Sequence, residues 1–405
     1  MDVFCEPALP THAAPLPVEP SVNDATFGNW RNAAVEVWQG RNKDKRWEDV
    51  APTCYPPIDV TSFGGKFALK RDLTALTVAF SLISLRGGGR GTHPTGVGAR
   101  GEVTILPTPN LPEHAFFRPG AVFPCRFRHA NGSFTDDAAC TLRGASLKLA
   151  DSDFESPLDI LFNTGSQGPL WSLASFIRFS KARRACDPVK GDFEGQARLM
   201  DECPAYLMSW IEAVRDAPSS FADVTYFSQV VFPFVGLDGV LRLCRYRLRR
   251  PDLEQESGLC DAARQHEVWN MLRKPEDTRP LDYLRQEFTQ RVKRGGVEYR
   301  LQIQVRDIVP ASDTLEVFHL NRPWSEARWP WHDLARIELN EAMDPTEIET
   351  TRYSLGHQPE GLGIFRPSSA VDYRSVAWAR LFIYQSAQRA RLFRAHKATP
   401  AHPYA

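Results

Sequence analysis

The chain has 405 residues, of which 42% are hydrophobic, so it is long enough to bury a large core. Its 49 basic residues balance 49 acidic ones, which excludes a global electrostatic field that would recruit nucleic acid or an anionic membrane. No apolar run approaches the roughly 18 residues of a membrane span, and the N-terminal sequence MDVFCEPALPTHAAPLPVEP lacks the regions of a secretory leader. We expect a cytoplasmic protein without a nucleic-acid partner.

The eight cysteines are spread along the chain without a CxxC pair or a fixed spacing. Zinc sites and disulfide frameworks both depend on cysteines that are grouped in a recognisable pattern. We therefore expect reduced and mostly buried thiols, with neither a disulfide framework nor a zinc site.

Residues 1–27 are rich in Pro and Ala with little periodicity, so we expect a flexible arm outside the core. A glycine-rich stretch, GGGRGTHPTGVGARG, occupies residues 87–101, and its GVGARG fits the dinucleotide-binding pattern GxGxxG. That pattern binds a phosphate only where a helix follows the glycines. Here the sequence continues as GEVTILPTPNLP, which is typical of a strand. The phosphate-loop interpretation therefore fails.

Strand signals then recur along the chain, at residues 101–106, 141–150, 224–235, 239–248 and 297–305. The last of these, VEYRLQIQV, alternates strictly and places five apolar residues on one face: Val297, Tyr299, Leu301, Ile303 and Val305. Strands and helices do not alternate as they would in a parallel sheet. We therefore expect the α+β class, with an antiparallel sheet or barrel and added helices.

Three segments are predicted helices: 198–216, 263–294 and 375–394. The last, SVAWARLFIYQSAQRARLFR, has the clearest helical pattern because it contains no Gly or Pro. Its basic residues gather in the last two turns, where the helix dipole favours them.

On this helix Arg380 and Tyr384 are four residues apart, so both project from one face. A tyrosine on an apolar helix is usually a core residue, and that interpretation stays open. In the alternative, the guanidinium favours the phenolate, which is a good axial ligand for ferric heme. Arg391, two turns later on the same side, would then bind a heme propionate.

His93 and Asn163 would complete the distal side of such a heme. Each alone has a more ordinary interpretation, since an isolated His is usually structural and Asn before Thr-Gly usually forms a turn. Together, an imidazole that transfers a proton and an amide that binds a peroxide suit chemistry on an oxygen–oxygen bond. The glycines around His93 would let the strand approach a flat macrocycle closely.

Five segments resemble the catalase superfamily and occur in its order, covering nearly all of residues 28–395: RGTHPTGVGARGEVTI, FPCRFRHANGSFTDDA, SPLDILFNTG, WPWHDLARIELN and ARLFIYQSAQRAR. The family's ligand motif R-L-F-x-Y is present at residues 380–384. The resemblance implies that Tyr384 binds the heme iron and that Arg380 keeps it ionised.

The other heme-site residues of the family also have counterparts in this sequence. The propionate-binding arginines correspond to Arg90, Arg126 and Arg391, and the distal pair corresponds to His93 and Asn163. Phe176, thirteen residues after Asn163, matches the phenylalanine over the distal face of the heme.

Departures from the catalases narrow the resemblance. Thr92 stands before the distal histidine where catalases have Val, QSAQ replaces DTHR after the ligand tyrosine, and Arg128 replaces a Ser. With Thr-His, the segments HANxxxxDDA, FNTG, YFSQV, CRYR and YRLQIQ resemble the catalase-related allene oxide synthases, hemoproteins that act on fatty acid hydroperoxides.

The resemblance implies one catalase-like domain over residues 28–395, followed by a tail at 396–405. An antiparallel β-barrel with surrounding helices would hold heme b against a heme-ligating C-terminal helix. The implied enzyme dehydrates a polyunsaturated fatty acid hydroperoxide, supplied by a lipoxygenase, to an allene oxide. Thr92 would hold His93 and discourage turnover of hydrogen peroxide.

Alternatives remain at this point. A small catalase or organic hydroperoxide peroxidase would use the same residues with His93 as acid and base, and a heme carrier or sensor would use none for turnover. The basic segment RARLFRAHK is either a solvated helix end or a peripheral membrane contact. The fatty acid, the product and a homo-oligomeric state stay open.

Overall fold

The computed structural model describes residues 4–5, 25–58, 63–87, 89–132, 135–310 and 312–395. The predicted tail and most of the predicted N-terminal arm lie outside these residues. Within the arm, β1 (Phe4–Cys5) pairs in parallel with β12 (Ile364–Phe365), and α1 begins at Ala25. Among the described helices, none is both long and apolar enough to cross a membrane.

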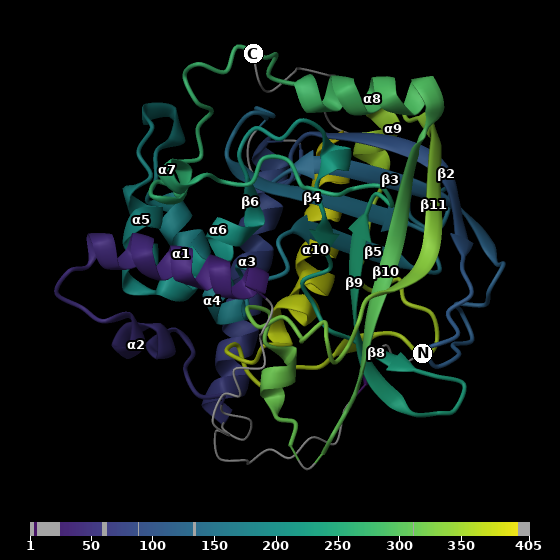
Figure 1. Ribbon diagram of the computed structural model, residues 1–405, viewed down its shortest axis with the longest axis horizontal. Coiled ribbons are helices and arrows are strands. Elements are labelled where there is room, and N and C mark those ends of the chain that lie inside the picture. Colours follow the sequence, from purple (N-terminus) through teal and green to yellow (C-terminus); the bar gives the residue numbers. More distant parts are fainter. Residues whose placement is uncertain are drawn as a thin grey trace.

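Eight antiparallel strands of the described chain close into a β-barrel (Figure 1). The ring closes because β10 pairs with β11 on one side and with β9 on the other. Around the barrel the strands are β10 (Val297–Asp307), β11 (His332–Ala342), β2 (Gly96–Ile105), β3 (Val122–Asn131), β4 (Thr141–Lys148), β5 (Asp159–Thr164), β7 (Tyr226–Phe227) and β9 (Leu241–Arg249). The short β8 (Phe232–Val235) and β6 (Val214–Arg215) pair with β9 and β4. The predicted α+β class with an antiparallel barrel is confirmed.

The alternation predicted for β10 holds over most of the strand. Its first four apolar residues are buried, and Tyr299 stacks on Phe127 of β3, with 5.3 Å between the ring centroids. The pattern then breaks, because Gln304 is buried and Val305 is only half-buried. Gln304 is accommodated by donating a hydrogen bond to the carbonyl of Trp329 at 2.6 Å.

The sequence GVGARG lies in β2, as expected of a strand rather than a phosphate loop. A Cβ at Gly101 would overlap the carbonyl oxygen of Glu338 on β11. The pairing of β2 with β11 shifts register next to this position, between Leu339 and Glu341. Glycine therefore permits a close approach of two backbones beside a bulge.

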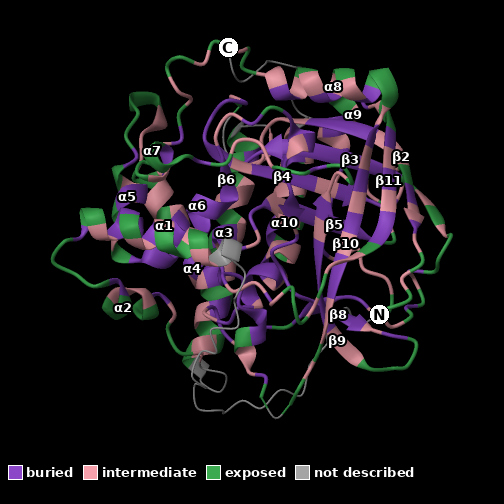
Figure 2. Ribbon diagram, in the orientation of Figure 1, coloured by how far each residue is buried: buried purple, intermediate pink, exposed green. Residues whose placement is uncertain are grey.

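Helices cover one side and one end of the barrel (Figure 1). They are α1 (Ala25–Arg41), α2 (Trp47–Val50), α3 (Phe63–Gly87), α4 (Leu173–Arg184), α5 (Glu194–Glu202), α6 (Pro204–Ala213), α7 (Ala262–Gln265), α8 (Tyr283–Gly295), α9 (Pro345–Thr350) and α10 (Ser375–Ala395). Short 3-10 turns occur at Ala51–Cys54, Pro188–Lys190, Phe221–Asp223 and Leu315–Phe318. The barrel strands are largely buried, whereas α2 and α8 expose outward faces (Figure 2).

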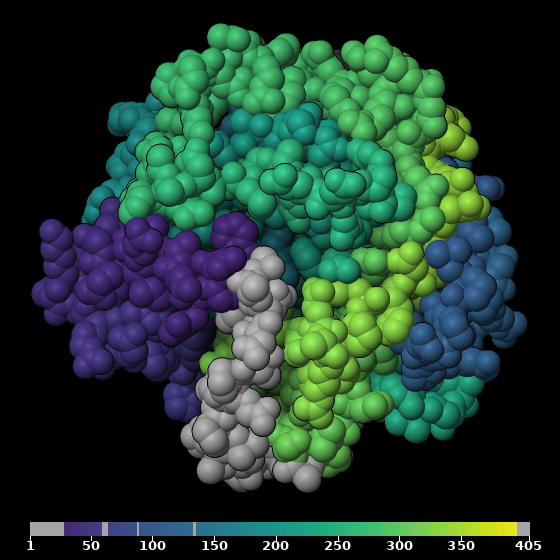
Figure 3. All heavy atoms as spheres, viewed as in Figure 1, coloured from purple at the N-terminus to yellow at the C-terminus, as the bar shows by residue number. Residues whose placement is uncertain are grey.

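Two long helices, α3 and α10, pack against each other, and the hydroxyls of Ser81 and Ser386 lie 2.8 Å apart between them. The start of α10 is also joined to the start of α4, since the backbone N–H of Leu173 donates to the Ser375 hydroxyl at 2.8 Å. In the space-filling view, the N-terminal helices (purple) and the β2–β3 region (blue) occupy opposite sides of one face (Figure 3).

The helix predicted over 375–394 is confirmed as α10, and two other helix predictions need correction. The segment 198–216 contains two helices, because Pro204 cannot continue α5 and instead starts α6. The segment 263–294 is helical only in α7 and α8, and turns that include Pro275 and Pro280 separate them.

The prediction that all cysteines are free thiols is wrong for one pair. Cys54 and Cys203 form a disulfide, with their Cα atoms 5.5 Å apart. The fold brings together two residues that are 149 positions apart, so no local spacing could indicate the bond. The remaining described cysteines of the helical and barrel regions are free, and four of them are buried: Cys125, Cys140, Cys244 and Cys260.

Candidate active site

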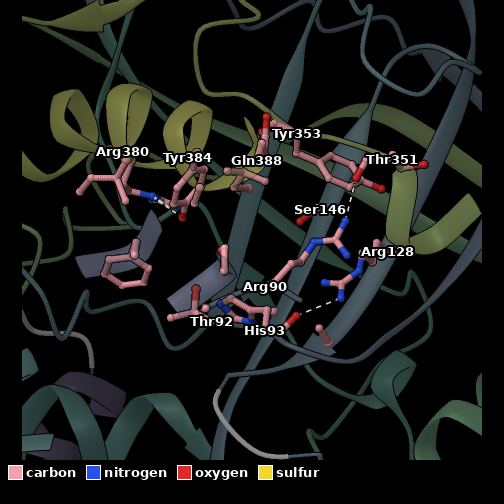
Figure 4. A pocket seen from close by; sticks show the side chains of 18 of the residues that line it. Arg90, Thr92, His93, Arg128, Ser146, Thr351, Tyr353, Arg380, Tyr384 and Gln388 are labelled. Carbon is pink, nitrogen blue, oxygen red and sulfur yellow. Dashed lines mark hydrogen bonds between the residues drawn. The ribbon is translucent and has the colours of Figure 1, made fainter. Parts of the chain in front are cut away.

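Helix α10 forms one wall of a cavity that we call the inner cavity (Figure 4). Arg380 and Tyr384 both line it, and the Arg380 Nε–H donates a hydrogen bond to the Tyr384 hydroxyl at 2.9 Å. Gln388 and Arg391 continue the same helical face along the cavity. The helix therefore presents a phenol, with a guanidinium bound to its oxygen, to an internal space.

The segment that precedes β2 forms part of the opposite wall. His93 has a φ of 54°, a left-handed conformation that is costly for a residue other than glycine. Two hydrogen bonds hold it there: its N–H donates to the carbonyl of Gly132 at 2.9 Å, and Arg128 donates to its carbonyl at 2.9 Å. Backbone strain held in place by neighbours is typical of functional sites.

A glycine in β4 makes room for the His93 ring. A Cβ at Gly144 would lie 2.7 Å from Cε1 and 2.8 Å from Nδ1 of His93, so any larger residue would displace the imidazole. The Nδ1 atom is buried and has no hydrogen-bond partner among the described residues. Burial, reinforced by the charges of Arg128 and Arg380, lowers the pKa of His93 to about 3. The imidazole is therefore neutral in this protein at neutral pH.

Asn163 lies on β5 and lines the same cavity, and its amide is oriented by Gln229. The Gln229 Nε2 donates to the carbonyls of Thr164, Gly165 and Gln167 at 2.9–3.2 Å. Its Oε1 is left to accept from the Asn163 Nδ2 at 3.2 Å. Gln229 also has a left-handed φ of 53°. Gln229 was not predicted as a site residue from the sequence, although it lies in the segment YFSQV.

Three arginines line one end of the inner cavity: Arg90, Arg128 and Arg391. Figure 4 shows two of them, Arg90 and Arg128, close together. Arg90 binds Glu349, whose carboxylate lies 3.7 Å from Arg128. Arg391 is only 6% exposed and makes no hydrogen bond or ion pair within the described parts of the chain. Burial and the positive charge of Arg90 lower the pKa of both Arg128 and Arg391 to about 9. This end of the cavity therefore favours an anion.

Arg126, which the resemblance assigned to a propionate, does not line the cavity. Its guanidinium binds Asp151 at 2.7 Å, Asp153 at 2.6 Å and the hydroxyl of Thr351. Arg126 pairs with Lys148 across β3 and β4, at the end of β4 from which the loop carrying both aspartates departs. Arg128 lies two residues further along β3, opposite Ser146 and away from that loop. Its side chain lines the cavity, in the position that the resemblance assigned to Arg126.

Thr92 lines the cavity. Among the described residues no hydrogen bond joins its hydroxyl to His93, the residue that the resemblance expected Thr92 to hold. Its side chain and that of His93 face the same space (Figure 4). Phe176 on α4 is half-buried and packs edge to face on Phe80 of α3, with 5.7 Å between the ring centroids.

A second, larger cavity of about 610 Å³ adjoins the first, and we call it the outer cavity. The two share seven lining residues: Phe80, Gly91, Thr92, His93, Asn163, Arg380 and Tyr384. Apolar side chains from α3, α4, α6 and α10 supply much of the remaining wall, among them Leu76, Phe176, Phe179, Trp210 and Val376. A polar site is thereby continuous with an apolar chamber.

No protein-family model matches this chain. It is 36% identical over 381 residues to the allene oxide synthase-lipoxygenase protein of Plexaura homomalla, an alignment that covers 92% of this chain and 34% of that protein. It is 30% identical over 310 residues to the linolenate 9R-lipoxygenase of Nostoc sp. strain PCC 7120, covering 74% of this chain and 38% of that protein. The chain thus spans little more than a third of the length of these curated relatives.

Solved catalase structures share the fold. Catalase A from Saccharomyces cerevisiae superposes with a TM-score of 0.59 at 18% identity, over 78% of this chain and 64% of that one. A fungal catalase gives a TM-score of 0.58 at 19% identity, over 78% and 62% of the two chains. The chain is therefore a catalase-fold homologue of an allene oxide synthase-lipoxygenase protein, which confirms the predicted resemblance to the catalase-related allene oxide synthases.

Proposed function

We propose that this chain is a heme-dependent enzyme that dehydrates polyunsaturated fatty acid hydroperoxides to allene oxides. The observation that carries the proposal is the Arg380–Tyr384 pair, which faces His93 in a polar cavity that opens into an apolar chamber. The names of the two relatives support a substrate made by a lipoxygenase.

The residues of the inner cavity fit heme b. Tyr384 would ligate the iron, and the hydrogen bond from Arg380 would favour its phenolate form. Heme carries two carboxylates, and the cluster of the half-buried Arg90 with the buried Arg128 and Arg391 has only Glu349 as an acidic partner among the described residues. When bound, ferric heme would supply the redox chemistry that cleaves the peroxide bond.

The chain's own residues would bind and orient the hydroperoxide. The neutral His93 imidazole can accept a hydrogen bond from the hydroperoxide O–H, because its low pKa leaves a ring nitrogen lone pair free at neutral pH. Asn163 donates one amide N–H to Gln229 and keeps the other for a peroxide oxygen. The apolar walls of the outer cavity exclude water from the acyl chain. The substrate loses the elements of water, so no external oxidant is required.

A small catalase or organic hydroperoxide peroxidase is the alternative, and the shared fold with catalases favours it. The outer cavity argues for the fatty acid substrate, because hydrogen peroxide needs no apolar chamber of about 610 Å³. A carrier or sensor of heme would need neither the strained His93 nor an oriented Asn163.

Product analysis tests the proposal. Purified, heme-loaded protein should convert at least one member of a panel of polyunsaturated fatty acid hydroperoxides to a product lighter by one water, detected by mass spectrometry as the allene oxide or its hydrolysis products. The same preparation should evolve little oxygen from hydrogen peroxide. Vigorous oxygen evolution without consumption of any fatty acid hydroperoxide would favour the catalase alternative.

A further inference from the structure

The mouth of the outer cavity is cationic. Its lining includes Arg86 from the end of α3 and three residues from the last turn of α4: Lys181, Arg183 and Arg184. Arg86, Lys181 and Arg184 are exposed, whereas the apolar lining residues Leu76, Phe179 and Trp210 are buried. The positive charges therefore lie where the cavity meets solvent, together with the exposed apolar residues Leu82 and Ile83, and the buried part of the wall is apolar.

Three of these four cations, Arg86, Lys181 and Arg184, have no acidic partner among the residues that the structure describes. The described lining of the outer cavity contains no Asp or Glu. Arg86, Lys181 and Arg184 make no ion pair with any described residue, although most arginines elsewhere in the molecule are paired. Arg178, on the same helix, pairs with Glu202 at 3.1 Å and does not line the cavity.

The mouth and the reaction residues are joined by one helix. Phe176 lies on α4 beside Phe80, which also lines the inner cavity, and Lys181 and Arg184 follow five and eight residues later. At about 1.5 Å per residue, the helix separates them from Phe176 by roughly 8–12 Å. The outer cavity is thus polar at both ends and apolar between them.

We propose that Arg86, Lys181 and Arg184 bind the carboxylate of the fatty acid. This inference rests on the proposed function. The acyl chain would lie against the apolar wall, with the carboxylate at the solvent and the hydroperoxide at His93 and Asn163. A hydroperoxide at a fixed distance from the carboxylate would be placed correctly, so the same contact would select the regioisomer.

Binding of an unreactive probe tests the inference without turnover. Linoleate and methyl linoleate would be titrated into the heme-loaded protein by calorimetry, in one non-ionic detergent below micellar concentration. The wild type should bind the acid roughly tenfold more tightly than the ester. Lys181→Gln combined with Arg184→Gln should remove this preference, and Arg86→Gln should reduce it. The matched control, Arg178→Gln, should keep the preference of the wild type.

Salt provides a second readout, because charge–charge attraction at an exposed site is screened. The acid preference of the wild type should shrink between low and high salt, and the double variant should show no salt dependence. Equal affinity of the wild type for acid and ester, or an unchanged preference in the double variant, would overturn the inference.

Hydroperoxides of the same two probes separate this inference from the proposed function. If the wild type and the double variant dehydrate the ester hydroperoxide at equal rates, the proposed function is supported. The carboxylate contact is then decided by the preference for acid over ester in binding alone. If neither hydroperoxide is converted while the acid preference in binding persists, the contact stands and the proposed function fails.

Discussion

The two walls of the inner cavity are built in different ways. The α10 wall is one regular helix, and its groups share a face by spacing alone: Arg380, Tyr384, Gln388 and Arg391. The barrel wall combines residues from separate segments, and two of the residues that build it, His93 and Gln229, have left-handed backbones. A regular helix places side chains on one face without backbone strain. The barrel wall contains strained backbone conformations, which the surrounding contacts must stabilise.

This difference suggests a division of labour. We propose that the α10 wall holds the cofactor and the opposite wall acts on the peroxide, except that Arg90 and Arg128 reach the cofactor from the opposite wall. Substitutions in the two walls should then have separable effects on heme content and on turnover.

The largest effect is expected on the barrel wall. His93→Ala or Asn163→Ala should lower hydroperoxide turnover by roughly 10²–10⁴-fold, the usual contribution of a positioned proton-transfer or peroxide-binding group. Heme content, measured as the pyridine hemochrome, should not change, because neither residue binds the iron in our account. The exposed His266, which lines neither cavity, provides the control variant His266→Ala. Loss of heme in either site variant would contradict the assignment of cofactor binding and peroxide chemistry to separate walls.

The arginine cluster gives the next largest effect. Arg128→Gln or Arg391→Gln should weaken heme retention by roughly ten- to a hundredfold, since each removes a charged hydrogen bond worth about 1.5–3 kcal/mol. Heme transfer to apomyoglobin measures this loss.

Arg126→Gln is the matched control on the same strand. It leaves Asp153 without its guanidinium partner and Asp151 with Arg100 alone, so thermal stability should fall while heme retention stays at the wild-type level. If Arg126→Gln instead loses heme as fast as Arg128→Gln, then the assignment implied by the family resemblance is right and ours is wrong.

A smaller effect is expected at Gln229, which positions Asn163. Gln229→Leu should lower turnover roughly tenfold, as the loss of one orienting hydrogen bond of about 1–1.5 kcal/mol would. A double-mutant cycle tests whether Gln229 acts through Asn163. In the Asn163→Ala background, Gln229→Leu should have no further effect on turnover. Additive losses would show that Gln229 acts on stability or on another group.

The smallest effect is expected at Thr92. Because its hydroxyl faces the cavity without a bond to His93, we expect it to act on the bound peroxide directly. Thr92→Val should raise oxygen evolution from hydrogen peroxide roughly fivefold, the equivalent of one hydroxyl hydrogen bond of about 1 kcal/mol. Turnover of fatty acid hydroperoxides should survive. A Clark electrode at matched heme concentration measures the change, and a fall in oxygen evolution would count against this role.

The α10 wall was predictable from the sequence because four-residue spacing determines which side chains share a helix face. The β10 pattern likewise identified a barrel strand. The sequence could not predict that Arg128, rather than Arg126, lines the cavity. Arg126 is kept away from it by Asp151 and Asp153, and the position of these carboxylates depends on the loop that carries them. The family resemblance alone could not detect it.

The supports of the barrel wall were also missed. Gly144 matters only because β4 passes under the His93 ring, and Gln229 matters only because three carbonyls surround its amide nitrogen. Helix α3, which the sequence analysis did not predict, encloses the outer cavity through packing against α10. Each of these depends on contacts between distant segments, which local patterns do not reveal.

Absorbance spectroscopy of two tyrosine variants tests the central claim most directly. Tyr384 and Tyr353 both line the inner cavity, and the Tyr353 hydroxyl is buried without a hydrogen-bond partner among the described residues. The wild type should carry about one heme per chain, with the high-spin ferric spectrum of a tyrosinate ligand. Tyr384→Phe should abolish that spectrum, and Tyr353→Phe should retain it. An unchanged spectrum in Tyr384→Phe would contradict the account.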